Sequence, residues 1–256
     1  MPLKKQNNMN KRYLIIVALL MIFNLSYGQK WNEKFGAPKV VLIETNPWLM
    51  VIGSDVPTIA IYESGYIVYK RVVKKRMKYY SVKIDSVKTQ ELISDLGITD
   101  KLVKMKDYIE ASSWTDQPTN ELILNLDSVI VKRVYGNLRN DKKVRKKTPK
   151  HFLSVYDRLI KYENKDAKEW KPDFIEIMLT DYSYSPEDPI KWPKEWPDLK
   201  DSLTVKRSES LYSLYLPKEN FKEFIKLISE LKEKQAVEIN GKKFSVSYRF
   251  PFPNLR

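Results

Sequence analysis

Hydrophobic and polar residues alternate along several segments of the chain, and these segments predict β-strands. Three pairs of alternating segments surround the turns Ser64-Gly65, Asp127-Ser128 and Asn240-Gly241. Alternation on both sides of a short turn is typical of a β-hairpin. Further strands are expected where short apolar runs are rich in β-branched or aromatic residues. These runs are residues 40–43, 77–84, 174–179 and 211–216.

Three other segments space their hydrophobic residues as an α-helix does. The clearest covers residues 148–164, where Thr148-Pro149 is expected to supply the N-cap and the first helical residue. A second helix is expected over 217–231. A shorter one, over 87–96, is expected to end at Gly97.

The order strand, helix, hairpin occurs twice along the chain. Residues 80–96 and 212–231 contain the similar strings Leu-Ile-Ser-Asp-Leu and Leu-Ile-Ser-Glu-Leu. We therefore predict an α+β fold of two related modules, each an antiparallel sheet with a helix packed on one face. Trp170-Lys-Pro172 marks the boundary, which gives modules over residues 29–168 and 169–256.

The first 28 residues have the pattern of a secretory signal peptide. Lys11 and Arg12 precede an apolar run that ends at Phe23, and small residues stand at Ser26 and Gly28. A membrane span needs about 20 apolar residues, and this run is shorter. We predict cleavage between Gly28 and Gln29, with translation starting at Met1 or Met9. The mature chain is expected to have no membrane span.

Net charge and the lack of cysteine limit the expected location of the protein and the expected class of partner. Loss of Lys4, Lys5, Lys11 and Arg12 lowers the net charge from +14 to +10. An exported protein rarely meets nucleic acid, so anionic envelope lipid, glycan or acidic protein is the expected partner class. The sequence has no cysteine. This excludes a disulfide framework and a lipid-modified cysteine, and it predicts a soluble periplasmic or secreted protein.

Few residues in the sequence suggest catalysis or metal binding. His151 is the single histidine, and no cysteine or Gly-x-Ser-x-Gly nucleophile accompanies it. No cofactor or metal is expected, because the spacing of ligands for either is missing. The alternative is a hydrolase with a carboxylate pair, as in glycoside hydrolysis. Its candidate residues are Asp100, Asp107, Glu110 and Asp116.

Basic residues gather in two clusters between predicted elements, and these clusters are candidates for binding anions. The alternative interpretation is a pair of solvated, charged loops. The candidate residues are Lys70, Arg71, Lys74, Lys75 and Arg76 in the first cluster, and Arg145, Lys146 and Lys147 in the second.

Residues 182–197 combine aromatic residues with prolines, a composition typical of an extended, stiff loop. Tyr182, Tyr184, Trp192 and Trp196 are candidates for contact with a sugar or a protein partner. The alternative is that the same rings fix the loop onto the core.

Several short motifs give the region from Pro57 to Trp170 a recognisable order. They are Tyr62-x2-Gly65-x3-Tyr69, a helix around Leu92, Asp116-x-Pro118-Thr119 before a hairpin, and Thr148-Pro149 before a helix. This order resembles uncharacterised domain families of exported proteins of Gram-negative bacteria. The resemblance implies export and an α+β module, and it carries no catalytic residue. We therefore expect an exported, non-catalytic binding protein of the cell envelope; the alternative is an envelope hydrolase, and the oligomeric state stays open.

Overall fold

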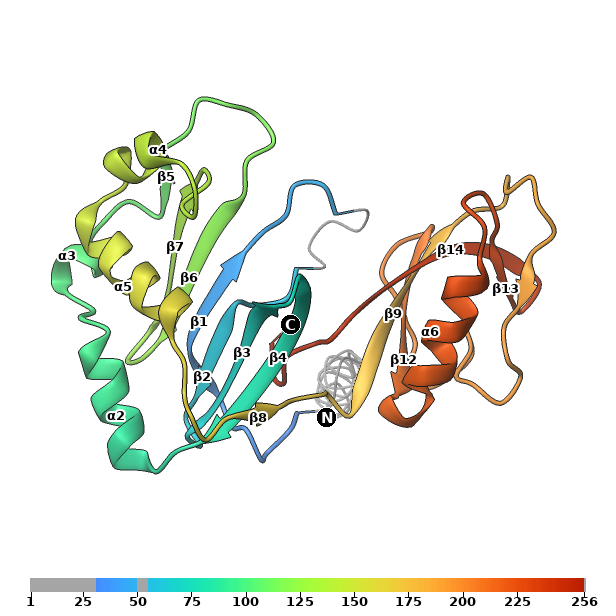
Figure 1. Cartoon of the computed structure of the whole chain (residues 1–256), viewed down its shortest axis with the longest axis horizontal. Helices are drawn as coiled ribbons and strands as arrows, with labels where there is room; N and C mark the ends of the chain where they lie inside the picture. The colour runs from blue at the N-terminus through green and yellow to red at the C-terminus, as the bar shows by residue number, and fades with distance from the viewer. Residues whose placement is uncertain (1–30, 50–54, 256) are drawn as a thin grey trace, which may run out of the picture.

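The computed structural model describes residues 31–49 and 55–255, and it folds into two modules with a sheet each (Figure 1). The predicted α+β class is confirmed. Both sheets are mainly antiparallel, and each contains one parallel pair, β5 with β7 and β10 with β13. The predicted leader and its cleavage point lie outside the described residues. No helix within 31–49 and 55–255 has the length and hydrophobicity needed to cross a membrane.

The first module holds an eight-stranded sheet in the order β5-β7-β6-β1-β2-β3-β4-β8. Its strands are β1 (Pro38–Glu44), β2 (Ile59–Tyr62), β3 (Tyr66–Val73), β4 (Arg76–Lys83), β5 (Tyr108–Glu110), β6 (Thr119–Asn125), β7 (Val129–Tyr135) and β8 (Lys168–Glu169). Its helices are α2 (Ser86–Asp95), α3 (Asp100–Val103), α4 (Lys142–Lys147) and α5 (Lys150–Lys161).

Helix α5 covers one face of this sheet and forms the main core with it. Phe152, Val155, Tyr156 and Leu159 are buried on α5, as their spacing predicts. They belong to one cluster with strand residues such as Leu42. Burial of apolar surface contributes about 25 cal/mol per Å², so this contact stabilises the module.

The second module holds a six-stranded sheet in the order β10-β13-β14-β9-β12-β11. Its elements are β9 (Phe174–Asp181), β10 (Ile190–Lys191), β11 (Val205–Lys206), β12 (Leu211–Pro217), a 3-10 turn (Lys218–Asn220), α6 (Phe221–Glu230), β13 (Val237–Ile239) and β14 (Lys242–Arg249). Helix α6 lies on one face, with Phe224 buried against Trp192 and Trp196.

The chain crosses between the modules twice. The linker, residues 170–173, leads from β8 to β9, and the C-terminal tail, residues 250–255, returns to the first module. The tail buries Phe252 on the sheet face away from α5, in a third cluster with Phe35 and Tyr62. The Tyr62 hydroxyl donates to the Pro253 carbonyl at 2.8 Å.

These crossings change the predicted domain limits. Strand β8 pairs with β4 in the first sheet, so residues 168 and 169 both belong to the first module. The second module therefore begins after Glu169. Phe250 still packs on the core of the second module, whereas Phe252 and Leu255 pack on the first, so the second module ends near residue 250 rather than at 256.

Two local predictions differ from the structure at the start of α5. Residues 136–147, expected as an irregular connection, contain α4, which begins after Asp141. The Asp141 carboxylate accepts hydrogen bonds from the backbone N–H groups of Lys143 and Val144, the usual role of an N-cap. Thr148 ends α4 by donating its hydroxyl to the Val144 carbonyl, and Pro149 stands at the N-cap of α5.

Candidate functional site

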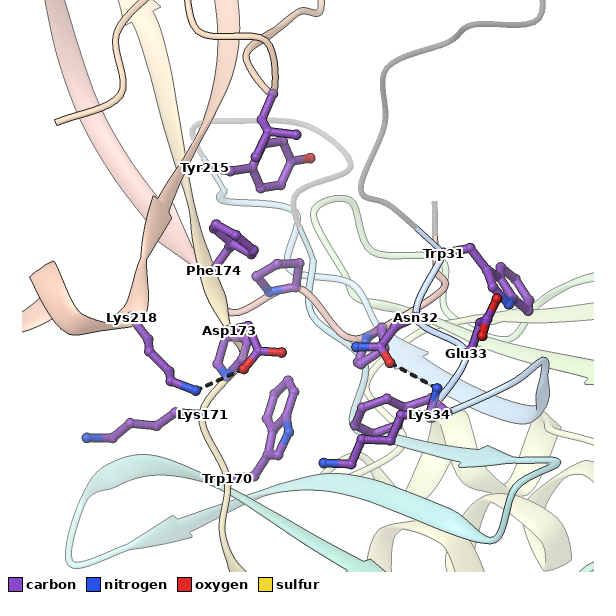
Figure 2. A pocket seen from close by; sticks show the side chains of 15 residues that line it. Trp31, Asn32, Glu33, Lys34, Trp170, Lys171, Asp173, Phe174, Tyr215 and Lys218 are labelled. Atoms are coloured by element: carbon purple, nitrogen blue, oxygen red, sulfur yellow. Dashed lines mark hydrogen bonds and ion pairs between the residues drawn. The ribbon is translucent and has the colours of Figure 1, made fainter.

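A pocket of about 680 Å³ lies at the junction of the modules, and it is called the linker pocket here. Figure 2 shows the N-terminal arm, residues 31–35, on one side of it and the linker with residues of the second module on the other. The lining residues are Trp31, Asn32, Glu33, Lys34, Phe35, Trp170, Lys171, Pro172, Asp173, Phe174, Leu203, Tyr215, Lys218, Pro251 and Pro253.

The arm and the tail hold the walls of this pocket in place. Phe35 is buried in the third cluster and fixes the arm on the sheet. Asn254 fastens the tail to the arm: its side chain accepts from the Asn32 N–H at 2.7 Å and donates to the carbonyls of Asn32 and Gly36 at 2.9 and 2.7 Å. These three bonds join the tail to the arm and fix the position of both segments.

The linker is fixed by its contacts with the first module. The Trp170 N–H donates to the Tyr79 carbonyl at 2.8 Å, which continues the pairing of β8 with β4. The Trp170 ring meets the Phe252 ring edge-on, with centroids 5.4 Å apart. Prolines at 172, 251 and 253 stiffen the two crossing segments. The pocket is therefore framed by segments with little backbone freedom.

Aromatic rings on both sides of the linker pocket remain accessible. Trp31 is 58% exposed and Phe174 is 42% exposed, and Trp170 is half-buried between them and the tail. Tyr215 is buried, which raises the pKa of its hydroxyl, and Arg207 donates to that hydroxyl at 3.3 Å. Exposed rings at the walls of a concave site offer flat apolar surfaces for stacking.

The charged groups of the linker pocket nearly balance. Lys218 pairs with Asp173 at 2.9 Å, and the Lys34 ammonium lies over the Tyr66 ring at 5.0 Å. Glu33 and Lys171 carry opposite charges, and neither makes a hydrogen bond or ion pair with another described residue. The pocket therefore has polar groups at its rim without a strong field of either sign.

A second cleft, of about 740 Å³, opens on another side of the junction, where Lys171 lines both hollows. Several of its charged residues are paired within the described chain, whereas Arg76 and Lys171 are not. Lys78 pairs with Glu169 at 2.9 Å, and Arg249 pairs with Glu176, outside the lining, at 2.8 Å. Residues 50–54, which fall between two of its lining residues, lie outside the described chain, so the linker pocket is the candidate site.

The structure places the two predicted basic clusters at one end of the first sheet. The strand pairing places four strand ends side by side: the end of β7, the start of β6, the end of β1 and the start of β2. The turn from β3 to β4 lies at the same end of the sheet. Helix α4 follows β7 there (Figure 1). This end is called the basic end.

Three predicted anion-binding residues are engaged within the protein. Lys70 donates to the Val56 carbonyl at 2.8 Å, and burial lowers the pKa of its ammonium. Arg71 donates to the Tyr162 carbonyl and faces Glu163. Arg145 pairs with Asp157 at 2.6 Å. These three side chains stabilise the fold and are not available as free cations.

The remaining predicted cations are exposed. No side-chain hydrogen bond or ion pair within the described chain involves the cations of Lys74, Lys75, Arg76, Lys146 or Lys147. Lys74 and Lys75 form the turn between β3 and β4, both with positive φ, 50° and 63°. The structure thus brings the two clusters to one end of the module, and three of the eight candidate residues are engaged within the protein. Anion binding at this end stays a prediction.

Sequence reasoning missed the most connected polar group of the basic end, Glu44. Its carboxylate accepts from Arg139 at 2.6 and 2.8 Å, from the Thr58 hydroxyl at 2.6 Å and from Tyr156 at 2.7 Å. Burial alone would raise the pKa of this carboxyl. The hydrogen bonds from Arg139, Thr58 and Tyr156 lower the pKa by more than burial raises it, so the pKa lies below its ordinary value. An acid that directly follows the apolar run of β1 was the available indication.

The aromatic-proline loop corrects a prediction about two tryptophans. Trp192 and Trp196 are buried against Phe224, and the Trp192 indole donates to the Pro197 carbonyl at 2.9 Å. They fix the loop onto the core, which was the alternative, and they offer no surface for a partner. Tyr184 is exposed and Tyr182 meets it edge-on at 4.9 Å, so these two rings alone stay accessible.

The alternative prediction of a hydrolase gains no support from the contacts of its candidate residues. Lys132 donates to Asp107 at 2.7 Å and holds the pKa of that carboxyl low, the opposite of what a general acid needs. Asp100 lies next to Lys104 at 3.4 Å. His151 stands in the first turn of α5, and its Nε2 has no partner in the described chain. Within residues 31–49 and 55–255, no group of His, Cys, Asp and Glu gathers as a metal site would.

Comparison with protein-family models, with curated proteins and with solved structures gives no match to this chain. The resemblance to domain families of exported Gram-negative proteins therefore stays a prediction. The site is described by its own geometry alone.

Proposed function

We propose that this protein is an exported, non-catalytic binding protein of the cell envelope, and that the linker pocket holds an uncharged segment of a glycan. Export is supported by the signal-peptide pattern of residues 1–28. Binding rather than catalysis is supported by the single histidine and the lack of cysteine.

The observation that carries the proposal is the set of rings around one hollow. Trp31, Trp170 and Phe174 come from the arm, the linker and β9, and each lines the linker pocket. Aromatic faces stack on the apolar faces of sugar rings, and polar groups at the rim pair with their hydroxyls. Asn32, Glu33 and Lys171 supply such groups (Figure 2).

The charges of the linker pocket favour a neutral ligand. Asp173 and Lys218 neutralise each other, and Glu33 offsets Lys171. A strongly anionic glycan would need several free cations in the pocket, as at the basic end, where lysines stand without acids to balance them. The linker pocket therefore suits a sugar bound by stacking and hydrogen bonds.

The test is calorimetry of the mature protein with chitohexaose, maltohexaose and laminarihexaose. One of these oligosaccharides should bind, with an affinity that changes little with salt because no ion pair is formed. Trp31→Ala and Phe174→Ala should each weaken binding by about tenfold, the loss of one stacked ring. Trp114→Ala, which removes a ring 75% exposed elsewhere in the first module, is the matched control and should bind as the unchanged protein does.

Lack of binding to all three oligosaccharides, or equal losses in Trp114→Ala, would contradict the proposed ligand. The export part of the proposal has its own measurement. Mass spectrometry of the protein recovered from the envelope should find Gln29 at its N-terminus, and an intact leader in the membrane fraction would contradict cleavage.

A further inference from the structure

The hairpin of β3 and β4 extends beyond its neighbours at the basic end. Ile59 pairs with Tyr69, and Glu169 pairs with Tyr80. The hairpin continues past these two points with its own register, from Arg71 opposite Lys78 to Val73 opposite Arg76. These residues, 71–78, are called the hairpin tip. The tip is therefore a projection from the sheet.

Apolar residues on the hairpin tip are exposed. Val72 is 67% exposed, and Met77 is 50% exposed. The two residues pair across the strands, so their side chains lie on one face of the hairpin. Trp48, 73% exposed, lines the same cleft as Met77. An exposed cross-strand apolar pair has no role in the core of the protein.

Exposed positive charge stands beside this apolar pair in the turn and, elsewhere on the basic end, along α4. Lys74, Lys75 and Arg76 make no ion pair within the described chain, and Lys142, Lys143, Lys146 and Lys147 add exposed cations on α4. Several acids of the basic end are already engaged in other bonds. Glu44 is bound by Arg139, Asp157 by Arg145, and Asp141 caps α4.

The backbone of the turn adds a second observation. Lys74 and Lys75 both adopt the left-handed region, which the turn of a tight hairpin requires and which Asn and Gly occupy at lower cost. Lysines at both positions therefore lower the stability of the turn, and they place two ammonium groups at the tip. Strain retained at an exposed position is a reason to look for a function of the side chains.

We infer that the basic end docks on an anionic lipid surface, with Val72 and Met77 entering the headgroup layer. Surface cations are attracted to anionic headgroups, and apolar side chains placed among them add binding at the boundary with the acyl chains. A polyanionic glycan has no apolar layer and would leave Val72 and Met77 in water, so the lipid surface is the better match. The inference does not depend on the ligand of the linker pocket.

The experiment is flotation of the mature protein with vesicles of phosphatidylcholine alone and with about 30% phosphatidylglycerol. The protein should float with the anionic vesicles only. Lys74→Glu/Lys75→Glu should lower the partition coefficient by at least about tenfold, because attraction becomes repulsion at the tip. Val72→Ser/Met77→Ser should lower it by several-fold at unchanged net charge.

Matched variants separate this surface from general charge and general hydrophobicity. Lys222→Glu/Lys226→Glu makes the same charge change on exposed positions of α6, and Val129→Ser removes an exposed valine from β7. Both should float as the unchanged protein does, and circular dichroism with a thermal midpoint checks the fold of every variant.

Three results would overturn the inference. The first is lack of flotation with anionic vesicles. The second is an equal loss in the α6 variant, which would make net charge the cause. The third is flotation that does not depend on Val72 and Met77 together with equally strong binding to heparin, which would make the basic end a general polyanion site. Trp31→Ala should not change flotation, so a failure of the linker-pocket proposal is recognised separately.

Discussion

At the scale of single residues, Glu44 connects elements that are far apart in the sequence. It stands at the end of β1 and binds Thr58 before β2, Arg139 after β7 and Tyr156 on α5. Its side chain is 13% exposed, so its charge depends on these donors. A carboxylate with several charged or neutral donors is stable when buried only while all of them are present.

We expect Glu44→Gln to lower the free energy of unfolding by about 2–4 kcal/mol at pH 7, because Arg139 loses its buried partner. The folded-state pKa of Glu44 is lowered, so its contribution is fully present above the ordinary value of 4.5 and is lost as pH falls through the folded-state value. The difference in free energy of unfolding between the unchanged protein and Glu44→Gln should therefore shrink below pH 4.5. Urea unfolding at neutral and acid pH measures it.

The control for Glu44 is Glu209→Gln, which removes an exposed carboxylate paired with Lys206 at 2.8 Å. Glu209→Gln should change the free energy of unfolding by no more than about 0.5 kcal/mol, as expected for a surface ion pair. A loss for Glu44→Gln that is constant from neutral to acid pH would show that the carboxylate charge does not stabilise the fold.

At the scale of elements, two hairpin turns share one backbone shape and differ in sequence. Lys74-Lys75 and Asn240-Gly241 both have positive φ at both residues. We expect Lys74→Asn/Lys75→Gly to raise the free energy of unfolding by about 1–2 kcal/mol, because Asn and Gly adopt this region at lower cost. Thermal or urea unfolding measures the gain.

The reciprocal change provides the control. Gly241→Lys should destabilise the protein by about 1 kcal/mol, and the cost would be conformational, because a Cβ at Gly241 meets no atom within 4 Å. Asn240 is left unchanged because its side chain binds Leu199 and Asp198. Loss of stability in the Lys74→Asn/Lys75→Gly variant would instead show that the lysines contribute contacts to the fold.

Elements with a clear period could be predicted from the sequence, and elements without one could not. The hairpin at Ser64-Gly65, helix α5, helix α6 and the Asn240-Gly241 turn all stand where the pattern places them. Helix α4 was missed because its six residues hold a single buried apolar residue, Val144, and Asp141 was its one local indication. Strands β8, β10 and β11 have two residues each, too few to show a period.

At the scale of the whole molecule, the linker pocket could not be predicted for a related reason. Its walls meet only after both modules have formed, since Trp31, Trp170 and Pro251 are far apart in the sequence. Alternation and helical spacing describe neighbours within one element, and they carry no information on which loops meet. The basic end was predictable because its lysines are local clusters, and the pairing of Lys70, Arg71 and Arg145 was not.

The tail should stabilise the first module although it follows the second in sequence. We expect Phe252→Ala to lower the free energy of unfolding by about 3–5 kcal/mol, because it leaves a cavity in the third cluster. Hydrogen exchange should increase most in β2 and β3, on which Phe252 packs. Tyr184→Ala, at an exposed ring, should change stability by less than about 0.5 kcal/mol.

An increase of exchange in Phe252→Ala that is confined to β9 and β12 would show that the tail belongs energetically to the second module.

The return of the tail also determines the order of folding. The third cluster joins Phe35 to Phe252, so its closure requires a loop that spans nearly the whole described chain. Contacts of such sequence separation form late, because the entropy of closing the loop is lost before the contact compensates for it. The second module is therefore complete in sequence before the tail can cover this face of the first sheet. We expect the first module to reach its full stability only after the tail has returned to it.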